Sequence, residues 1–243
     1  MSPQMAAMFW VAVERGASLI VAAEPPSAGK TATLSALLAF TPPETTVYFT
    51  RGLGETFALP PRTDSHATYL LINEMSDHLP VYTWNGYARC AFELLAEGYS
   101  LATTMHADSV EGVLAQLEGE LDIPRQQIAN LTFIVFLYVG DHGATVRRVR
   151  EVAFLQPDGD DLSVANAARW DSQRDDFQVL VDGSQRAAFA RWTGLSEERL
   201  ERELGRRQAF LERLLEDGKL SIPEVNAAIE GYYEEVLRPR RGG

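Results

Sequence analysis

The stretch Ser18–Thr31, SLIVAAEPPSAGKT, decides the fold expected for this chain. Its first part, Ser18–Ala23, is an apolar run without alternation, which is typical of a strand buried on both faces. Residues 24–31 then fit the pattern G-x-x-x-x-G-K-[ST], except that Glu24 stands in place of the first glycine. A helix-forming run, TATLSALLAF, follows and stops at a proline pair. A strand, this loop and a helix in this order predict an α/β fold with a phosphate-binding loop.

The residues predicted to bind the phosphates of a nucleotide are Ser27, Ala28, Gly29, Lys30 and Thr31. Such a loop needs backbone N–H groups at a helix N-terminus, a lysine that reaches the β- and γ-phosphates, and a hydroxyl for Mg²⁺. The three residues that open the loop depart from this requirement: Glu24 adds a carboxylate, and Pro25 and Pro26 each lack an N–H. The alternative is a tight strand-to-helix turn that binds nothing.

Two further candidates follow apolar strands. Glu74 comes after the predicted strand Thr68–Ile72, and His106 comes after the predicted strand Ser100–Met105. In an open α/β sheet, ligands lie at the carboxyl ends of the strands. We therefore expect Glu74 to hold Mg²⁺ together with Thr31, or to orient an attacking water, and His106 to act beside it. The alternatives are a surface acid at a strand end and a structural histidine.

The remaining pattern alternates strands with helices, which predicts a mostly parallel sheet. Two late strands, Leu131–Val139 and Thr145–Leu155, are joined at the turn signal Asp141-His142-Gly143 and would add antiparallel strands at one edge. The other expected elements are helices at Met5–Arg15, Trp84–Ala96 and about Val110–Leu117, a strand at Thr45–Thr50, and a loop from Gly52 to Thr63.

The tail changes character near Asp182-Gly183 and predicts a helical hairpin. Between Ser196 and Gly218 five leucines share one helix face, and a second helix starts near Pro223 with its own apolar stripe. The first stripe is Leu200, Leu204, Leu211, Leu214 and Leu215, and the second is Val225, Ile229, Tyr232, Tyr233 and Val236. The final RPRRGG is expected to be a frayed basic end.

Composition excludes several classes of protein. The 243 residues are 46% hydrophobic, enough for a sizeable core, and the formal net charge of −12 argues against a nucleic-acid partner. A single cysteine, Cys90, allows no disulfide within the chain, which fits a reducing cytosol, and its apolar neighbours favour burial in the core. The apolar opening is interrupted by charged residues and lacks a basic leader, so neither a membrane span nor a signal peptide is expected.

Three motifs in this order resemble the type II/IV secretion ATPase family, whose members drive secretion and pilus assembly. VAVERGASLIVAAEPPSAGKT resembles the opening of its C-terminal ATPase domain, LLINEMSD its Walker B stretch, and AEGYSLATTMHADS its histidine box. VRRVREVAFLQPDGD is similar to its basic strand. ARWDSQRDDF and the tail GLSEERLERELGRRQAFLERLL resemble the archaeal-type branch, which includes the archaellum motor.

This resemblance implies a RecA-like P-loop NTPase core over residues 1–181 and a C-terminal helical appendage over residues 182–243. It also implies ATP and Mg²⁺ as cofactors, with Lys30 and Thr31 in the phosphate loop, Glu74 as the Walker B acid and His106 as the histidine-box residue. The expected assembly is a homo-hexamer, or a hetero-oligomer with a related ATPase, docked on a membrane platform protein. The expected location is the cytoplasm, peripheral at the inner face of the membrane.

Four departures separate this chain from the family pattern. Glu24 replaces the first glycine of the phosphate loop, and Ser76 replaces the Walker B arginine. The family's acidic box is here Thr50–Glu55, TRGLGE, in which Glu55 is the nearby acid. The family's N-terminal domain, which helps form the subunit interface, is not matched because the chain opens on the ATPase domain.

The sequence is thus compatible with three functions. The first is an ATPase subunit of a secretion or filament-assembly machine, and the second is a non-hydrolysing nucleotide-binding subunit that regulates such a machine. The third is a structural module with a vestigial loop. The degraded acidic box favours the second function, whereas Lys30, Thr31, Glu74 and His106 favour the first.

Overall fold

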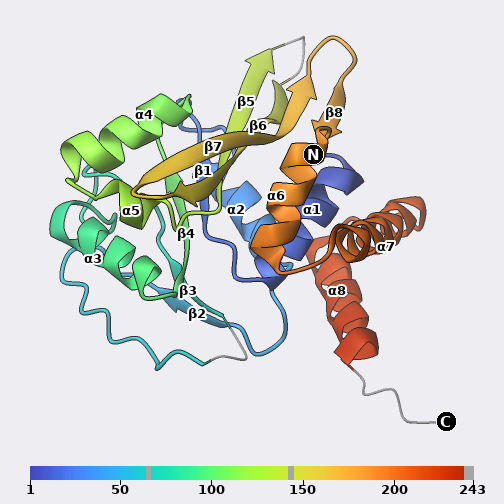
Figure 1. The fold of residues 1–243 in the computed structure, drawn as a ribbon, viewed down its shortest axis with the longest axis horizontal. Coiled ribbons are helices and arrows are strands. Elements are labelled where there is room, and N and C mark those ends of the chain that lie inside the picture. The colour runs from blue at the N-terminus through green and yellow to red at the C-terminus, as the bar shows by residue number, and fades with distance from the viewer. Residues whose placement is uncertain (64–66, 142–144, 238–243) are drawn as a thin grey trace.

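The computed structural model describes residues 1–63, 67–141 and 145–237. Within these ranges the chain forms one eight-stranded sheet with helices on both faces (Figure 1). The strands are β1 (Leu19–Ala22), β2 (Thr46–Phe49), β3 (Thr68–Leu71), β4 (Ser100–Met105), β5 (Phe133–Asp141), β6 (Thr145–Asp158), β7 (Asp161–Asp171) and β8 (Asp176–Val179). The helices are α1 (Pro3–Glu14), α2 (Lys30–Leu38), α3 (Asn85–Ala96), α4 (Val110–Leu114), the π-helix η1 (Ala115–Glu120), α5 (Arg125–Ile128), α6 (Gly183–Thr193), α7 (Glu197–Glu216) and α8 (Ile222–Leu237).

The strand order is β2-β3-β4-β1-β5-β6-β7-β8. The first five strands in this order run parallel, and β6, β7 and β8 continue the sheet with antiparallel pairing. The central strand β1 is buried along its whole length between β4 and β5, as its uninterrupted apolar sequence predicts. The expected fold class, a mostly parallel α/β sheet with antiparallel edge strands and C-terminal helices, is confirmed.

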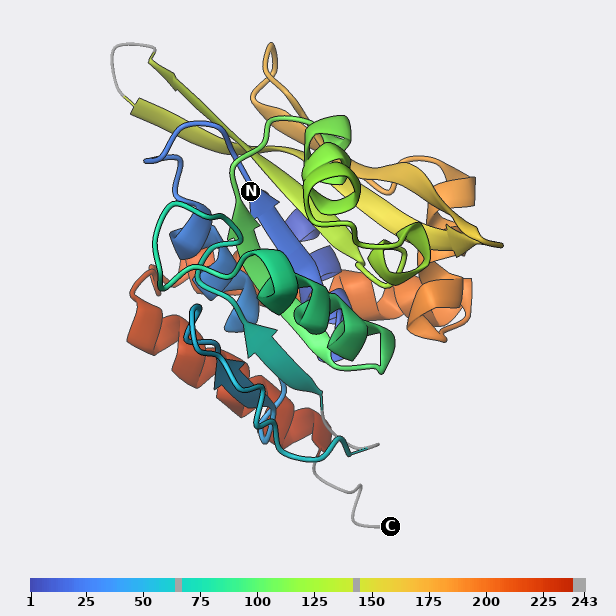
Figure 2. The same cartoon turned by 90° about the vertical axis from the view of Figure 1, so that its left-hand side faces the viewer.

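Two layers of helices enclose the sheet. The helices α3, α4 and α5 cover one face, and α1, α2, α6 and the tail helices α7 and α8 cover the other (Figure 1, Figure 2). Each face has its own apolar core, one built around Phe92, Met105 and Ile134 and the other around Trp10, Phe133 and Phe189. The second core includes residues from the tail, so the tail helices belong to the same packed body as the sheet.

The antiparallel part of the sheet is larger than the sequence predicts. A tight turn at Gly159-Asp160, in which Gly159 has φ 62°, returns the chain from β6 into β7, and β8 follows as the edge strand. Neither β7 nor β8 was expected, because β7 is rich in alanine and polar residues, which are depleted in strands. Residues His142 and Gly143 of the predicted hairpin turn and the whole RPRRGG end lie outside the described residues.

The tail packs on α1 through an aromatic cluster. Trp10 of α1 is fully buried and stacks on Phe40 with ring centroids 5.1 Å apart. Its Nε1–H donates to the hydroxyl of Tyr233 on α8 at 2.9 Å, and that hydroxyl donates to the carbonyl of Phe40 at 2.7 Å. Arg207 of α7 is buried beside them and pairs with Glu14 and with Glu203.

Three side chains expected in the core are more exposed than predicted. Leu215 is 55% exposed and Val236 is 42% exposed, although the other members of their stripes are buried or packed against the core. Successive residues of a helix point about 100° apart, and on α7 this turns Leu215 toward solvent while Leu214 is buried. Cys90 is only partly buried, since it lies on the outer side of α3.

Candidate functional site

The candidate residues come from three strand ends that meet at one edge of the sheet. The phosphate loop follows β1, Glu74 follows β3, and His106 follows β4, which lies between β1 and β3. Ala22 pairs with Met105 in register, so His106 lies level with the start of the loop. Parallel strands present their carboxyl ends on the same side, which is why residues distant in sequence converge here.

The loop itself is a tight connection into α2. Gly29 caps this helix with φ 91°, a conformation that glycine adopts without strain. The N–H of Ala28 donates to the carbonyl of Pro25 at 3.2 Å, which closes the turn. The N–H groups of the first turn of α2 have no carbonyl partner within the helix, and they point out of its N-terminus. The loop therefore presents backbone donors where an anion can bind.

Lys30 is the buried cation of this site. Only 5% of the residue is exposed, and its ammonium lies 3.4 Å from the carbonyl oxygen of Ala23 and 3.1 Å from Nε2 of His106. Burial lowers the pKa of Lys30, while the negative charges of Glu74 and Glu24 act against that shift. A buried lysine whose partners are neutral acceptors can exchange those partners for phosphate oxygens.

His106 contacts both the phosphate loop and Lys30. Nδ1 lies 3.1 Å from the carbonyl oxygen of Glu24, which can only accept, and Nε2 lies 3.1 Å from the Lys30 ammonium, which can only donate. The ammonium of Lys30 also lies 3.4 Å from Nδ1. The imidazole of His106 thus connects the phosphate loop to the lysine.

Glu74 lies on the other side of His106. Its Oε1 is 3.5 Å from Nε2 of His106 and accepts a hydrogen bond from the hydroxyl of Ser76 at 3.1 Å. Nearby, the hydroxyl of Thr104 donates to the carbonyl of Asn73 at 2.9 Å, and the N–H of Met75 donates to the carbonyl of Thr104. The turn that carries Glu74 is thus tied to β4, which fixes the carboxylate at the sheet edge.

The residues predicted to hold magnesium fit that role when a phosphate is present. In the described part of the chain, Oε2 of Glu74 has no hydrogen-bond or ion-pair partner, and Thr31 is exposed on the first turn of α2. No group of three or more histidine, cysteine, aspartate or glutamate side chains among the described residues could bind a metal alone. Mg²⁺ is commonly held by one or two protein ligands together with phosphate oxygens and water, which suits Thr31 and Glu74.

Glu55 does not face this site as a free acid. Its Oε1 accepts from the hydroxyl of Tyr48 and the N–H groups of Thr56 and Phe57, and its Oε2 accepts from the N–H of Arg51, all at 2.7 Å. Burial would raise the pKa of Glu55, but these four hydrogen bonds hold it below its ordinary value. The carboxylate therefore organises its own loop.

Two polar contacts at the site were not predicted. Gln116, on the π-helix, donates to the main-chain carbonyl of His106 at 2.7 Å. Arg147, near the start of β6, donates from Nε to the carbonyl of Ser27 at 3.2 Å. A π-helix often accompanies a functional site, but its presence is not visible in a sequence pattern. The contact between Arg147 and Ser27 joins residues 120 positions apart, which no local pattern predicts.

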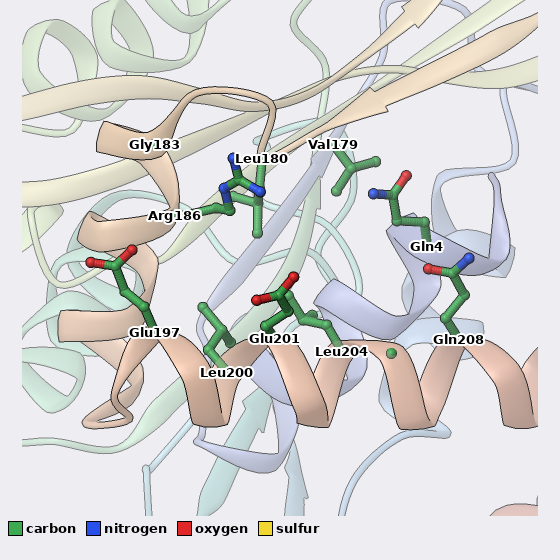
Figure 3. Close-up of a pocket in the computed structure, with 11 residues that line it drawn as sticks. Gln4, Val179, Leu180, Gly183, Arg186, Glu197, Leu200, Glu201, Leu204 and Gln208 are labelled. Atoms are coloured by element: carbon green, nitrogen blue, oxygen red, sulfur yellow. The ribbon is translucent and has the colours of Figure 1, made fainter.

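A cavity of 410 Å³ lies elsewhere, between α1, β8, α6 and α7 (Figure 3). Its walls combine Leu200 and Leu204 of α7 with the charged side chains of Arg186, Glu197 and Glu201. None of the predicted site residues lines this cavity. It marks a place where the tail meets the sheet without filling the space completely.

No model of a known protein family matches the chain. Two uncharacterized proteins of Methanocaldococcus jannaschii resemble it in sequence. MJ1287 is 26% identical over 239 residues, which cover 88% of this chain and 87% of the relative. MJ0900 is 24% identical over 267 aligned residues, which cover 97% of this chain and 47% of the relative. The chain thus spans nearly all of the first relative and about half of the second.

Solved structures with a related arrangement include the VirB11 ATPase from the Brucella suis type IV secretion system, in complex with sulphate, with 21% identity and a TM-score of 0.42. The ATPase DotB of Yersinia pseudotuberculosis has 14% identity and a TM-score of 0.37, and DotB of Legionella pneumophila has 8% and 0.35. The matches cover 60%, 95% and 89% of this chain. The chain spans 50% of the VirB11 chain and 61% of each DotB chain.

Proposed function

We propose that this chain binds Mg-ATP at the loop between β1 and α2 and hydrolyses it as a subunit of a secretion or pilus-type assembly machine. The observation that carries the nucleotide part is the meeting of Lys30, His106 and Glu74 at one sheet edge, directly beside the N-terminus of α2. A buried lysine, free helix N–H groups and a strand-end carboxylate are the parts that a phosphoryl-transfer site uses.

Binding would proceed by exchange of the contacts that Lys30 makes in the free chain. The ammonium leaves the Ala23 carbonyl and His106 and meets the β- and γ-phosphates, while the N–H groups of residues 29–31 hold the phosphate oxygens. Thr31 and Glu74 would hold Mg²⁺, which neutralises charge on the phosphates when bound. Because the exchange replaces neutral acceptors with charged ones, it favours the bound state.

Glu74 and His106 are the residues proposed to act in hydrolysis. The Oε2 of Glu74, which is not engaged by another described residue, can accept a hydrogen bond from the attacking water and orient it. Once Lys30 has moved to the phosphates, Nε2 of His106 is released and can meet the terminal phosphate or its water. The carboxylate of Glu74 is held by the Ser76 hydroxyl and the ring of His106 by the carbonyl of Glu24, so little rearrangement is needed.

The assignment to a machine rests on the order and spacing of the three motifs. We propose that residues 1–181 form a RecA-like ATPase domain and that residues 182–243 form its helical appendage. Its partners are identical or related subunits in a ring and a membrane platform protein, with the chain located in the cytoplasm at the inner face of the membrane. The described residues contain no helix that is both long and apolar enough to cross a membrane.

A second candidate function is favoured by one observation. Because its four hydrogen bonds hold Glu55 against its own loop and Tyr48 of β2, the acid of the acidic-box segment does not serve the nucleotide. A nucleotide-binding subunit that regulates such a machine without hydrolysis would share the binding chemistry and lack turnover. Steady-state phosphate release distinguishes the two functions.

The experiment that tests nucleotide binding compares the two lysines of the chain. Lys30→Ala should weaken Mg-ATP binding about 10-fold or more in isothermal titration, since a charge-assisted hydrogen bond contributes about 1.5–3 kcal/mol. Lys219→Ala is the matched control, because Lys219 is exposed and pairs with Asp217 in the tail. Equal affinity of wild type and a folded Lys30→Ala variant would refute the proposal.

A further inference from the structure

Arg147 brings the hairpin of β5 and β6 against the phosphate loop. Its Nε donates to the carbonyl of Ser27, and its Cδ lies 3.6 Å from the position that a side chain on Gly29 would occupy. In Figure 2 the loop between β1 and α2 runs beside this hairpin. The guanidinium of Arg147 is therefore held at the tip of the loop, next to the N-terminus of α2.

The neighbouring arginines of β6 are engaged differently. Arg148 makes a two-pronged pair with Asp175, and Arg150 donates to the main-chain carbonyl of Asp108 and lies over the ring of Phe136. For Arg147, Nε is the one guanidinium nitrogen engaged within the described residues. Its two terminal nitrogens still carry hydrogen-bond donors. Of these three arginines, Arg147 thus keeps donors available at the loop.

The phosphate loop lacks some of the backbone N–H donors of the standard pattern, and the terminal nitrogens of Arg147 can supply donors in their place. Pro25 and Pro26 have no N–H, and the N–H of Ala28 is used by the carbonyl of Pro25. Glu24 adds a negative charge next to Lys30, where a polyanion is proposed to bind. The loop therefore has fewer backbone donors and a less favourable charge than the standard pattern. A second cation at the tip of the loop supplies both hydrogen-bond donors and positive charge.

We propose that Arg147 is a phosphate-binding residue of this site, and that it supplies from β6 the donors and charge that the sequence Glu24-Pro25-Pro26 removes. The inference rests on the proposed nucleotide binding. The guanidinium keeps its Nε bond to the Ser27 carbonyl and turns its terminal nitrogens toward the bound phosphates. A planar fork with several donors suits phosphate oxygens, whereas a surface arginine without a ligand gains little from this position.

The test compares three variants of the full chain in titrations with Mg-ATP. Arg147→Ala should raise the dissociation constant about 10-fold, equivalent to about 1.4 kcal/mol. Arg147→Gln should weaken binding to the same degree, because its amide can still donate to the Ser27 carbonyl but carries no charge. Arg148→Ala is the matched control and should keep the wild-type affinity, since Arg148 is paired with Asp175. Thermal melts establish that each variant is folded.

Each result has a defined meaning. Wild-type affinity for Mg-ATP in Arg147→Gln would show that Arg147 only stabilises the loop. Wild-type affinity in Arg147→Ala would show that Arg147 does not contribute to binding. Either result overturns the inference. If Lys30→Ala still weakens binding in that case, the proposed nucleotide site survives without Arg147. If the wild-type chain itself does not bind Mg-ATP, the proposed function fails first.

Discussion

Tyr232 and Tyr233 are adjacent on α8, but removal of their hydroxyls should affect stability differently. Loss of the Tyr233 hydroxyl should destabilise the fold, whereas loss of the Tyr232 hydroxyl should not. The hydroxyl of Tyr233 accepts from Trp10 and donates to the carbonyl of Phe40, and all three residues are buried. The hydroxyl of Tyr232 is also buried, but no described residue gives it a hydrogen-bond partner. The two side chains share one environment and differ in whether their polar atom is satisfied.

The magnitude follows from the groups that each substitution leaves unpaired. Tyr233→Phe leaves the indole N–H of Trp10 and the carbonyl of Phe40 buried without a partner, at about 1–3 kcal/mol each. A total loss of about 2–6 kcal/mol lowers Tm by about 4–24 °C for a chain of this size. Tyr232→Phe removes a buried polar atom that has no partner to leave behind, so Tm should stay unchanged or rise.

The assay is thermal unfolding of both variants and wild type, followed by circular dichroism in one buffer and supported by urea titration. A decrease in stability in Tyr233→Phe alone would confirm that the tail is fixed to α1 by this hydrogen-bond pair. If Tyr232→Phe were destabilised as much as Tyr233→Phe, the effect would belong to general packing, and the hydrogen-bond argument would be wrong.

Three further predictions concern the site and the tail. Glu74→Gln should still bind Mg-ATP but lower kcat, measured by phosphate release, because it removes charge near the attacking water without changing the shape of the side chain. The wild-type chain alone should turn over below about 1 s⁻¹. Glu55→Gln should be less stable than wild type at pH 7, and this difference should disappear as pH falls. The lowered pKa of Glu55 means that its contribution is complete above its ordinary value of 4.5 and is lost as pH falls through the folded-state pKa, which urea titrations at several pH values would detect. A chain ending at residue 181 should aggregate on light scattering because it uncovers Trp10 and Phe40, and a soluble fragment as heat-stable as the full chain would contradict this expectation.

The parts of the fold that follow from local sequence were predicted, and those that depend on distant contacts were not. The run Ser18–Ala23 and the loop through Thr31 are a self-contained strand, turn and helix start, so their pattern is legible without tertiary context. β7 is a strand mainly because β6 and β8 pair with it on either side, and its alanine-rich sequence has little β preference of its own. α6 was missed for a similar reason, since its apolar residues form no clear stripe.

In the candidate site, too, the positions of single residues could be predicted from the sequence, whereas their contacts could not. The positions of Glu74 and His106 at one sheet edge follow from two apolar strands that end in polar residues, which sequence can reveal. Their mutual contacts depend on the order β3-β4-β1, which places His106 between Glu74 and the loop, and no sequence pattern prescribes that order. The role of Glu55 depends on a loop conformation that offers it three N–H groups and the Tyr48 hydroxyl.

These contacts bear on whether the chain is an enzyme or a regulator. A carboxylate orients water only through an oxygen that water can reach, whereas Glu55 is only 7% exposed and its oxygens already accept hydrogen bonds from Tyr48 and Arg51. Among the described carboxylates, Glu74 is the one within 4 Å of a His106 ring nitrogen, and its Oε2 is not engaged by another described residue. If the chain hydrolyses ATP, Glu74 must therefore serve both the magnesium shell and the attacking water. One carboxylate that shares these two tasks positions the water less tightly than two separate acids would. Slow turnover that depends on Glu74 is thus the behaviour that this geometry supports, and turnover independent of Glu74 would require an acid from another subunit.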